Sequence, residues 1–260
     1  MEAVKIDSLS FKRKQRHIFQ SLTLSISKGQ FIGLLGPNGT GKSTLLKCIA
    51  GIISEHEGSI ALLGKQKNSM KPIEMAKMVS YMPQTTFLET NFTVEQVVKM
   101  GRYPHKKRFS SWDSADSEAV QRALEFTNIG HLKDRLVPSL SGGERQLVYL
   151  AKAIAQDTPI LLLDEPTSDL DVYHQVMVTN ILHQLIREGK TVMAAIHDIN
   201  FATRICDQCI FLKDGQIVDF GRNEQIMCDR NFFETFHVKS HIYKEPFTGK
   251  KQMIPYDVHE

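Results

Sequence analysis

The fold of this chain is decided by one stretch of nine residues, Gly36-Pro37-Asn38-Gly39-Thr40-Gly41-Lys42-Ser43-Thr44. The uniformly apolar run before it, residues 31–35, is typical of a strand buried in a parallel sheet. Residues 43–47 predict the start of a helix. The glycines allow backbone N–H groups between strand and helix to converge, and the helix N-terminus adds positive partial charge. The stretch therefore predicts a cradle for phosphate groups.

The spacing of this stretch matches the P-loop pattern G-x-x-x-x-G-K-[ST]. In that pattern the lysine, here Lys42, reaches the β- and γ-phosphates, and the hydroxyl of Ser43 ligates Mg²⁺. A chance glycine-rich turn before a helix is the alternative interpretation, but the required strand and helix are both present. All nine residues, 36–44, are therefore predicted to bind Mg-ATP.

Two further apolar runs end in polar residues, as the first one does. Residues 160–163 lead into Asp164 and Glu165, and residues 192–196 lead into His197. Because parallel strands bring their carboxyl ends to one edge, the pattern predicts a parallel sheet with its site along that edge. There Asp164 can reach a metal ion, and Glu165 can polarise an attacking water as general base. A simple helix cap is the alternative for this acidic pair, and the P-loop upstream argues against it.

The composition is that of an ordinary globular protein. The 260 residues are 42% apolar and 23% charged, and the net charge of +3 is too small to indicate nucleic acid as a partner. The four cysteines form no dense framework and favour a reducing compartment. No apolar run approaches the roughly 20 residues that span a bilayer, so we expect any membrane role to depend on a partner.

The order of sequence patterns predicts a single domain over residues 1–260. Alternating apolar residues within 4–9 and 22–26 predict short half-buried strands near the N-terminus. Residues from about 92 to 156 contain helical patterns and are predicted to be a helical insertion. Residues 222–260 are predicted to close the chain as a C-terminal tail.

A resemblance to the signature motif of the ABC ATPases lies in Leu140-Ser141-Gly142-Gly143-Glu144-Arg145-Gln146. Ser141 can cap a helix whose apolar face begins at Leu147. Gly142 and Gly143 let backbone N–H groups approach an anion closely. An ordinary helix cap with two glycines is the alternative, which the match over the whole stretch argues against. The family resemblance extends over about residues 4–221.

Other elements of that family follow in matching order. Gln84 resembles the Q-loop glutamine, residues 168–171 resemble the D-loop, and His197 resembles the switch histidine. The resemblance implies an α/β fold of the P-loop NTPase ABC ATPase type, with a mainly parallel sheet, an N-terminal antiparallel β part and a helical insertion. It assigns catalysis to Glu165, His197, Gln84 and Lys42, and the metal to Ser43, Gln84 and Asp164.

In this family the P-loop of one subunit and the signature motif of another enclose each ATP. The resemblance therefore implies that Ser141 and Gly143, with Gly142 between them, bind the γ-phosphate of a nucleotide held by a second subunit. It also implies that Asp169 and Asp171 help to join the two sites. Because the motifs of this chain are complete, we expect a homodimer.

The contact to adenine departs from the family's pattern. The family usually places an aromatic residue 29 positions before the P-loop lysine, and that position here is Arg13. Phe11, two residues earlier, is the nearest aromatic residue. Either Phe11 reaches the base through a longer loop or Arg13 stacks on it through its guanidinium face, and the sequence leaves both open.

The spacing and sequence of the motifs reduce the number of ABC ATPase classes to which this chain can belong. Ser141 follows Lys42 by 99 positions, which leaves no room for the long coiled coil of DNA-repair members. Residues 92–105 resemble the "FTV…V…GR-x-P-H" stretch of the iron-chelate, haem and cobalamin importers. The resemblance implies the ATP-hydrolysing motor of an importer for iron-siderophore, haem or cobalamin. Uptake of free metal (zinc, manganese) or oxyanion, and a soluble non-transport ABC ATPase, are the alternatives.

The kinship also implies partners and a location. The partners are integral permease subunits, a second ATPase subunit, and a substrate-binding protein only through the permease, with no nucleic acid. The location is the cytoplasmic side of the plasma (inner) membrane, where the permease holds the chain peripherally. Residues 84–105 are expected to face the permease, so charge reversal at Arg102 or substitution near Tyr103 is expected to uncouple transport from ATPase activity. A regulator that binds ATP without turnover is a rival, and the intact catalytic set argues against it.

Overall fold

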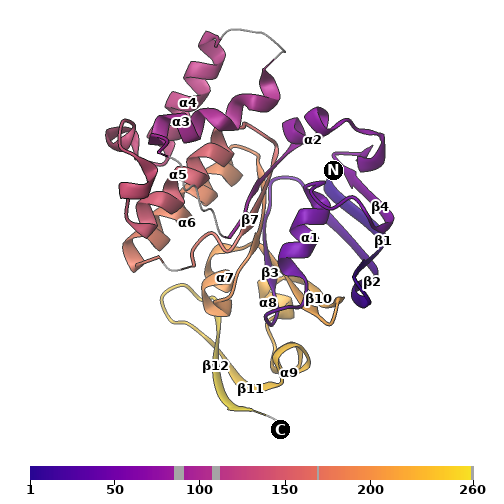
Figure 1. The fold of residues 1–260 in the computed structure, drawn as a ribbon. Helices are drawn as coiled ribbons and strands as arrows, with labels where there is room; N and C mark the ends of the chain where they lie inside the picture. The colour runs from indigo at the N-terminus through magenta and orange to yellow at the C-terminus, as the bar shows by residue number, and fades with distance from the viewer. Residues whose placement is uncertain (85–90, 107–111, 169, 259–260) are drawn as a thin grey trace.

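The computed structural model describes residues 1–84, 91–106, 112–168 and 170–258. Two sheets enclose helix α1 (Lys42–Ile49), and further helices gather on the other face of the central sheet (Figure 1). A two-stranded hairpin near the C-terminus projects beyond these layers (Figure 1).

The N-terminal sheet is antiparallel, with the strand order β2-β1-β4-β5. Its strands are β1 (Glu2–Arg13), β2 (Arg16–Ser27), β4 (Glu57–Leu62) and β5 (Lys65–Gln66). Along β2 the residues alternate between buried and exposed, with Leu22, Leu24 and Ile26 buried. Alternation with a period of two places one face of the sheet on the core and the other in solvent. The predicted N-terminal antiparallel β part is therefore present.

The central sheet has the strand order β10-β9-β3-β8-β7-β6. Its strands are β3 (Phe31–Leu35), β6 (Val79–Met82), β7 (Ile160–Asp164), β8 (Thr191–Ala195), β9 (Gln208–Lys213) and β10 (Gln216–Arg222). All neighbouring pairs are parallel except β9 with β10. The predicted mainly parallel sheet is confirmed, and β3, β7 and β8 are buried along their whole lengths.

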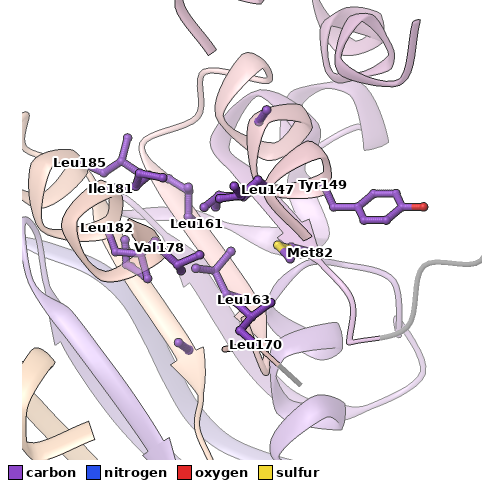
Figure 2. Packing of buried hydrophobic residues seen from close by; sticks show 14 of the residues in the cluster. Met82, Leu147, Tyr149, Leu161, Leu163, Leu170, Val178, Ile181, Leu182 and Leu185 are labelled. Atoms are coloured by element: carbon purple, nitrogen blue, oxygen red, sulfur yellow. The ribbon is translucent and has the colours of Figure 1, made fainter. Parts of the chain in front are cut away.

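Two apolar clusters cover the two faces of the central sheet. Successive residues of β7 point to opposite faces, so Leu161 and Leu163 belong to one cluster and Ile160 and Leu162 to the other. The first cluster joins β7 to α5 (Gly142–Ala155) and α6 (Val172–Arg187), as Figure 2 shows. The second cluster joins the sheet to α1 and the N-terminal strands. This sandwich fixes the carboxyl edge of the sheet, where the predicted site residues lie.

The helical insertion begins after β6 and ends with α5. Its elements are α3 (Val94–Lys99), the 3-10 helix η2 (Met100–His105), α4 (Ser114–Phe126), and the short 3-10 helices η3 (Gly130–Leu132) and η4 (Val137–Ser139). A Cβ at Gly101 would lie 2.3 Å from the Lys152 carbonyl oxygen, so η2 passes directly against α5. Arg102 is buried there, bonded to Asp116 at 3.0 Å and to the Ala155 carbonyl at 2.9 Å. Its guanidinium thus joins η2 to α4 and α5, so charge reversal at Arg102 would disturb this packing, and the expected uncoupling of transport stays a prediction.

The remaining elements surround this frame. They are the 3-10 helix η1 (Lys67–Ser69), α2 (Pro72–Met78), α7 (Ile199–Ile205), α8 (Asn223–Ile226), α9 (Asp229–Phe236), β11 (Val238–Lys244) and β12 (Lys251–Val258). Asn200 of α7 holds β12 through two hydrogen bonds with the backbone of Met253, at 2.8 and 2.9 Å. Within the described ranges, none of the helices combines the length and apolar character that crossing a bilayer requires.

Candidate nucleotide-binding site

The P-loop turns directly from β3 into α1. A Cβ at Gly36 would lie 2.1 Å from the Leu212 carbonyl oxygen, so a side chain there would displace the neighbouring strand β9. Gly41, which precedes α1, has a φ of 104° and lies against the ring of Phe19. The two glycines thus permit a tight turn that no larger residue could make.

Lys42 is folded into the loop that it follows. Its ammonium donates hydrogen bonds to the carbonyls of Gly36 at 2.6 Å and Pro37 at 3.0 Å, and only 6% of the residue is exposed. Burial lowers the pKa of Lys42, while the nearby carboxylates of Glu165 and Asp164 oppose that effect. A cation is therefore held inside the loop, beside two acidic residues from the end of β7.

The carboxylate of Asp164 is fixed by donors at both of its oxygens. Ser43 donates to Oδ1 at 2.8 Å, and the Tyr81 hydroxyl donates to Oδ2 at 3.1 Å. Asp164 is only 2% exposed. Burial and then Asp164 itself raise the pKa of Tyr81, which keeps its hydroxyl protonated and able to donate. The Ser43 and Asp164 oxygens lie together, as ligands of one cation would.

Glu165 turns away from Asp164 and contacts a different set of residues. Its φ is 54°, and its N–H donates to the Ala195 carbonyl at 3.1 Å. Gln84 Nε2 donates to Glu165 Oε2 at 2.6 Å, and His197 Nε2 is bonded to Glu165 Oε1. Three of the four residues that the family resemblance assigned to catalysis thus meet at the Glu165 carboxylate.

A cavity of about 700 Å³ connects these residues to the P-loop. The predicted site residues that line this cavity are Arg13, Asn38, Gly39, Gly41, Lys42, Ser43, Thr44, Gln84, Glu165 and His197. Pro37 and Thr40 line an adjoining cavity of about 490 Å³, and Thr40 donates to the Pro37 carbonyl at 2.9 Å. The predicted catalytic residues and six of the nine residues of the stretch 36–44 therefore line one cavity.

The two candidates for the adenine contact lie in different places. Arg13 lines the P-loop cavity, together with Lys14, Arg16 and Ile18 of the same hairpin. Phe11 lines a separate depression and packs against the core cluster of the N-terminal sheet. The structure therefore brings Arg13 and not Phe11 to the P-loop cavity. The contact to the base stays a prediction for either residue.

The signature residues form a regular helix start outside that cavity. Ser141 caps α5: its Oγ accepts from the Glu144 N–H at 3.2 Å, while its own N–H donates to the Glu144 carboxylate at 2.8 Å. Ser141, Gly142 and Gly143 are absent from the described lining of the P-loop cavity. Asp171 caps α6, and Asp169 lies outside the described residues. This arrangement is the one expected if the signature serves a nucleotide on another subunit.

Sequence reasoning missed two side chains that hold the site together. Tyr81 fixes Asp164, as described above. Gln146, within the quoted signature stretch, donates to the carbonyls of Glu165 at 3.4 Å and Pro166 at 3.1 Å, so it ties α5 to the loop after β7. The available signal was the position of Tyr81 three residues before Gln84, near the carboxyl end of β6.

A family model described as "ABC transporter" matches residues 19–168. The chain belongs to this family. Among its curated relatives is the iron(3+)-hydroxamate import ATP-binding protein FhuC of Bacillus subtilis, which is 36% identical over 99% of this chain and 96% of the relative. The ferric enterobactin transport ATP-binding protein FepC of Escherichia coli is also 36% identical, over 92% of this chain and 88% of that protein. The hemin import ATP-binding protein HmuV of Plesiomonas shigelloides is 34% identical over 94% of this chain and 98% of that protein.

A solved structure agrees with this assignment along the whole chain. A metal-chelate type ABC transporter in an inward-facing conformation has a TM-score of 0.86 and 30% identity, covering 98% of both chains. The predicted fold class and the predicted family are confirmed. The chain is an ATPase subunit of an ABC transporter, a class of proteins that acts together with membrane components.

Proposed function

We propose that this chain is the ATP-hydrolysing motor subunit of a membrane importer for an iron-siderophore, haem or cobalamin. The observation that carries the ATPase part is the meeting of Gln84, Glu165 and His197 at the mouth of the P-loop cavity. The cargo class is supported by the relatives, which are named for hydroxamate, enterobactin and hemin uptake. It is supported also by residues 92–105, which resemble a stretch found in that importer group.

The chemistry that we propose consists largely of positioning and charge neutralisation. The backbone of residues 36–44 and the N-terminus of α1 would hold the phosphates. Lys42 would exchange its bonds to the loop carbonyls for bonds to the β- and γ-phosphates. Because burial already disfavours its charge, the lysine gains most when phosphate oxygens replace the neutral carbonyls.

The residues present fit a magnesium ion. The oxygens of Ser43 and Asp164 lie 2.8 Å apart and are hard ligands of the kind that Mg²⁺ prefers. Gln84 donates to Glu165 through its amide nitrogen, and the amide oxygen of Gln84 would serve as a third ligand in this proposal. When bound there, Mg²⁺ would neutralise charge on the phosphates.

Glu165 is the general base in this proposal. Its carboxylate lies between Gln84 and His197, which can orient it toward a water beside the γ-phosphate. His197 is about two-fifths exposed and Glu165 about one-tenth, so the pair borders the cavity without being sealed from it. Both residues could therefore contact a bound nucleotide without rearrangement of the sheet.

The partners in this proposal are two permease subunits and a second copy of the chain. The segment 84–105 would face the permease, and Tyr103, with 67% of its surface exposed, is its best-placed described contact residue. The signature residues of the second copy would close the P-loop cavity. Contact with a permease would hold the chain on the cytoplasmic side of the plasma membrane.

The decisive experiment is uptake by cells that lack this protein. The panel contains labelled ferric siderophores, haem, cobalamin, zinc and manganese. The Glu165→Gln variant is the complementation control, because glutamine has the size of glutamate but cannot act as the general base. We expect loss of one iron-chelate, haem or cobalamin uptake, restored by the wild-type chain and not by the variant. Loss restricted to zinc or manganese would contradict the cargo class, and no loss at all would contradict the transport role.

A further inference from the structure

The N-termini of α5 and α6 meet at Gly143 and His174. A Cβ added to Gly143 would lie 2.7 to 2.8 Å from three atoms of the His174 ring, nearer than real Cβ atoms come to other atoms. The Gly143 backbone has no unusual φ, so this glycine is required for space and not for conformation. The histidine ring thus lies directly against the backbone of the signature residues.

Asp171 fixes the position of this ring. As the N-cap of α6, its Oδ1 accepts from the His174 N–H at 2.9 Å, and the ring Nδ1 lies 2.8 Å from the same oxygen. The His174 N–H and ring lower the pKa of Asp171, so the carboxylate remains ionised and able to accept. The side chain of His174 is 19% exposed, although it lies at the open end of the helix.

The ring also continues the apolar packing of α6 outward by one turn. His174 precedes Val178 by four residues and shares its helix face, which is buried at Val178, Leu182 and Leu185 in the cluster of Figure 2. Leu147 of α5, four residues after Gly143, belongs to the same cluster. Gly143 and His174 therefore form the outermost layer between the two helices.

We propose that His174 is a positioning residue, which sets how far the Gly142–Gly143 backbone advances toward a nucleotide held by a second copy of the chain. The inference rests on the proposed function, because it assumes that the signature binds such a nucleotide. His174 is not among the described residues that line the P-loop cavity. It therefore acts through Gly143, on the site that the two copies form together. The nucleotide in the P-loop cavity of the same chain is unaffected.

The physical reason is that a helix N-terminus stabilises phosphate charge only at hydrogen-bond distance. Without the ring, the contact that separates Gly143 from α6 is lost, and α5 can settle toward α6. A displacement of about 1 Å from mutation at a remote residue is enough to slow an enzyme substantially. The predicted defect is thus in pairing and turnover, with nucleotide binding by the separate chain intact.

The test compares three variants of the full chain. His174→Ala removes the ring, His174→Phe keeps a flat ring without the bond to Asp171, and His183→Ala is the control. His183 lies on the same helix, half-buried, with its ring bonded to the Ile205 carbonyl at 2.9 Å, away from Gly143. Three quantities are measured: kcat for ATP, ATP-dependent pairing in a Glu165→Gln background by sedimentation, and affinity of the separate chain for a fluorescent ATP analogue without Mg²⁺.

We expect His174→Ala to lower kcat and weaken pairing by about 10-fold each, with unchanged affinity for the analogue. His174→Phe should recover kcat to within about 3-fold of wild type, and His183→Ala should change neither kcat nor pairing. Unchanged kcat and pairing in His174→Ala would overturn the inference, and so would a parallel loss of analogue affinity or no recovery in His174→Phe. Absence of both activities in the wild-type chain would overturn the proposed function itself.

Discussion

At the scale of single residues, two neighbouring carboxylates have separate contacts. Asp164 is held by Ser43 and Tyr81, whereas Glu165 contacts Gln84 and His197. The backbone changes direction at Glu165, whose φ of 54° is uncommon for a residue with a side chain. Strain of this kind is retained where the surroundings enforce it, and here it keeps Asp164, the proposed metal ligand, apart from Glu165, the proposed general base.

Tyr81 offers a direct test of the metal site. Tyr81→Phe removes the donor to Asp164 Oδ2 and leaves a carboxylate with one fixed oxygen. Because outer-shell partners of metal ligands typically change affinity by 10–100-fold, we expect about 10-fold weaker Mn²⁺ binding in the presence of ATP, measured by electron paramagnetic resonance. The control Tyr243→Phe, on the C-terminal hairpin, should bind Mn²⁺ as wild type does. Equal affinity in the two variants would contradict the role of Tyr81.

His56 predicts a pH dependence of stability. Its Nε2 lies 2.6 Å from the ammonium of Lys67, which also donates to the Cys48 carbonyl at 2.9 Å. Burial and then Lys67 lower the pKa of His56 below its ordinary value of 6.5. The folded chain therefore binds this proton less tightly than the unfolded chain, and the free energy of unfolding should fall as pH drops below about 6.5.

Urea unfolding at about pH 7.5 and about pH 5.5 measures this effect. We expect the wild-type midpoint to fall more between the two pH values than that of His56→Gln, which cannot be protonated. An equal fall in both proteins would assign the acid sensitivity to other groups.

The sequence predicted the site residues that follow one another along the chain better than those that meet across it. The P-loop, Asp164 and Glu165 follow from local spacing. The bond from Tyr81 to Asp164 depends on β6 and β7 being neighbours in the sheet, and spacing along the chain does not give strand order. The contact of His174 with Gly143 likewise depends on how two helix ends meet.

At the scale of elements, a buried ion pair joins two parts of the helical insertion, η2 and α4. Arg102 and Asp116 are 8% and 3% exposed at their side chains, and Lys106 also contacts Asp116. Burial opposes the charge of Asp116, but Lys106 and Arg102 hold its pKa at about 2. The pair therefore fixes η2, and with it the exposed Tyr103, against α4 and α5.

Removing one partner of this pair should destabilise the fold. We expect Arg102→Ala to lower the free energy of unfolding by about 3 kcal/mol, since among the described residues it leaves the buried Asp116 carboxylate with Lys106 alone as cationic partner. The control Arg230→Ala breaks the exposed pair with Glu234 and should leave the urea midpoint unchanged. Equal midpoints for the two variants would show that the Arg102 pair does not support the fold.

Tyr103→Ala, unlike Arg102→Ala, should impair transport without destabilising the fold. Its side chain is exposed, so we expect normal stability and normal basal ATPase activity, with uptake of cargo lowered several-fold in cells. Parallel loss of ATPase activity and uptake would contradict a role in contacting the permease.

The strands that were predicted are those with a strong apolar pattern. Strands β3, β7 and β8 are buried at every residue, and their sequences are therefore continuous apolar runs. The tail was predicted without elements of its own, yet it contains the hairpin of β11 and β12. Most of β12 is exposed, so it lacks the apolar alternation that marks a half-buried strand.

At the scale of the whole molecule, the proposed nucleotide site is divided between two surfaces of one chain. Most of the predicted phosphate-binding residues and the predicted catalytic residues line the P-loop cavity, while the signature residues begin a helix outside it. In our proposal the signature residues of a second copy complete the cavity of the first. ATP would then drive pairing, and hydrolysis at Glu165 would release it.

Turnover and pairing of Glu165→Gln test this account most directly. The purified wild-type chain and the variant are compared for ATP hydrolysis, and for mass by sedimentation with and without Mg-ATP. We predict a loss of turnover of at least about 100-fold, the usual contribution of a general base, together with a stable ATP-dependent dimer. Hydrolysis at the wild-type rate, or a variant that remains monomeric with ATP bound, would contradict the central claim.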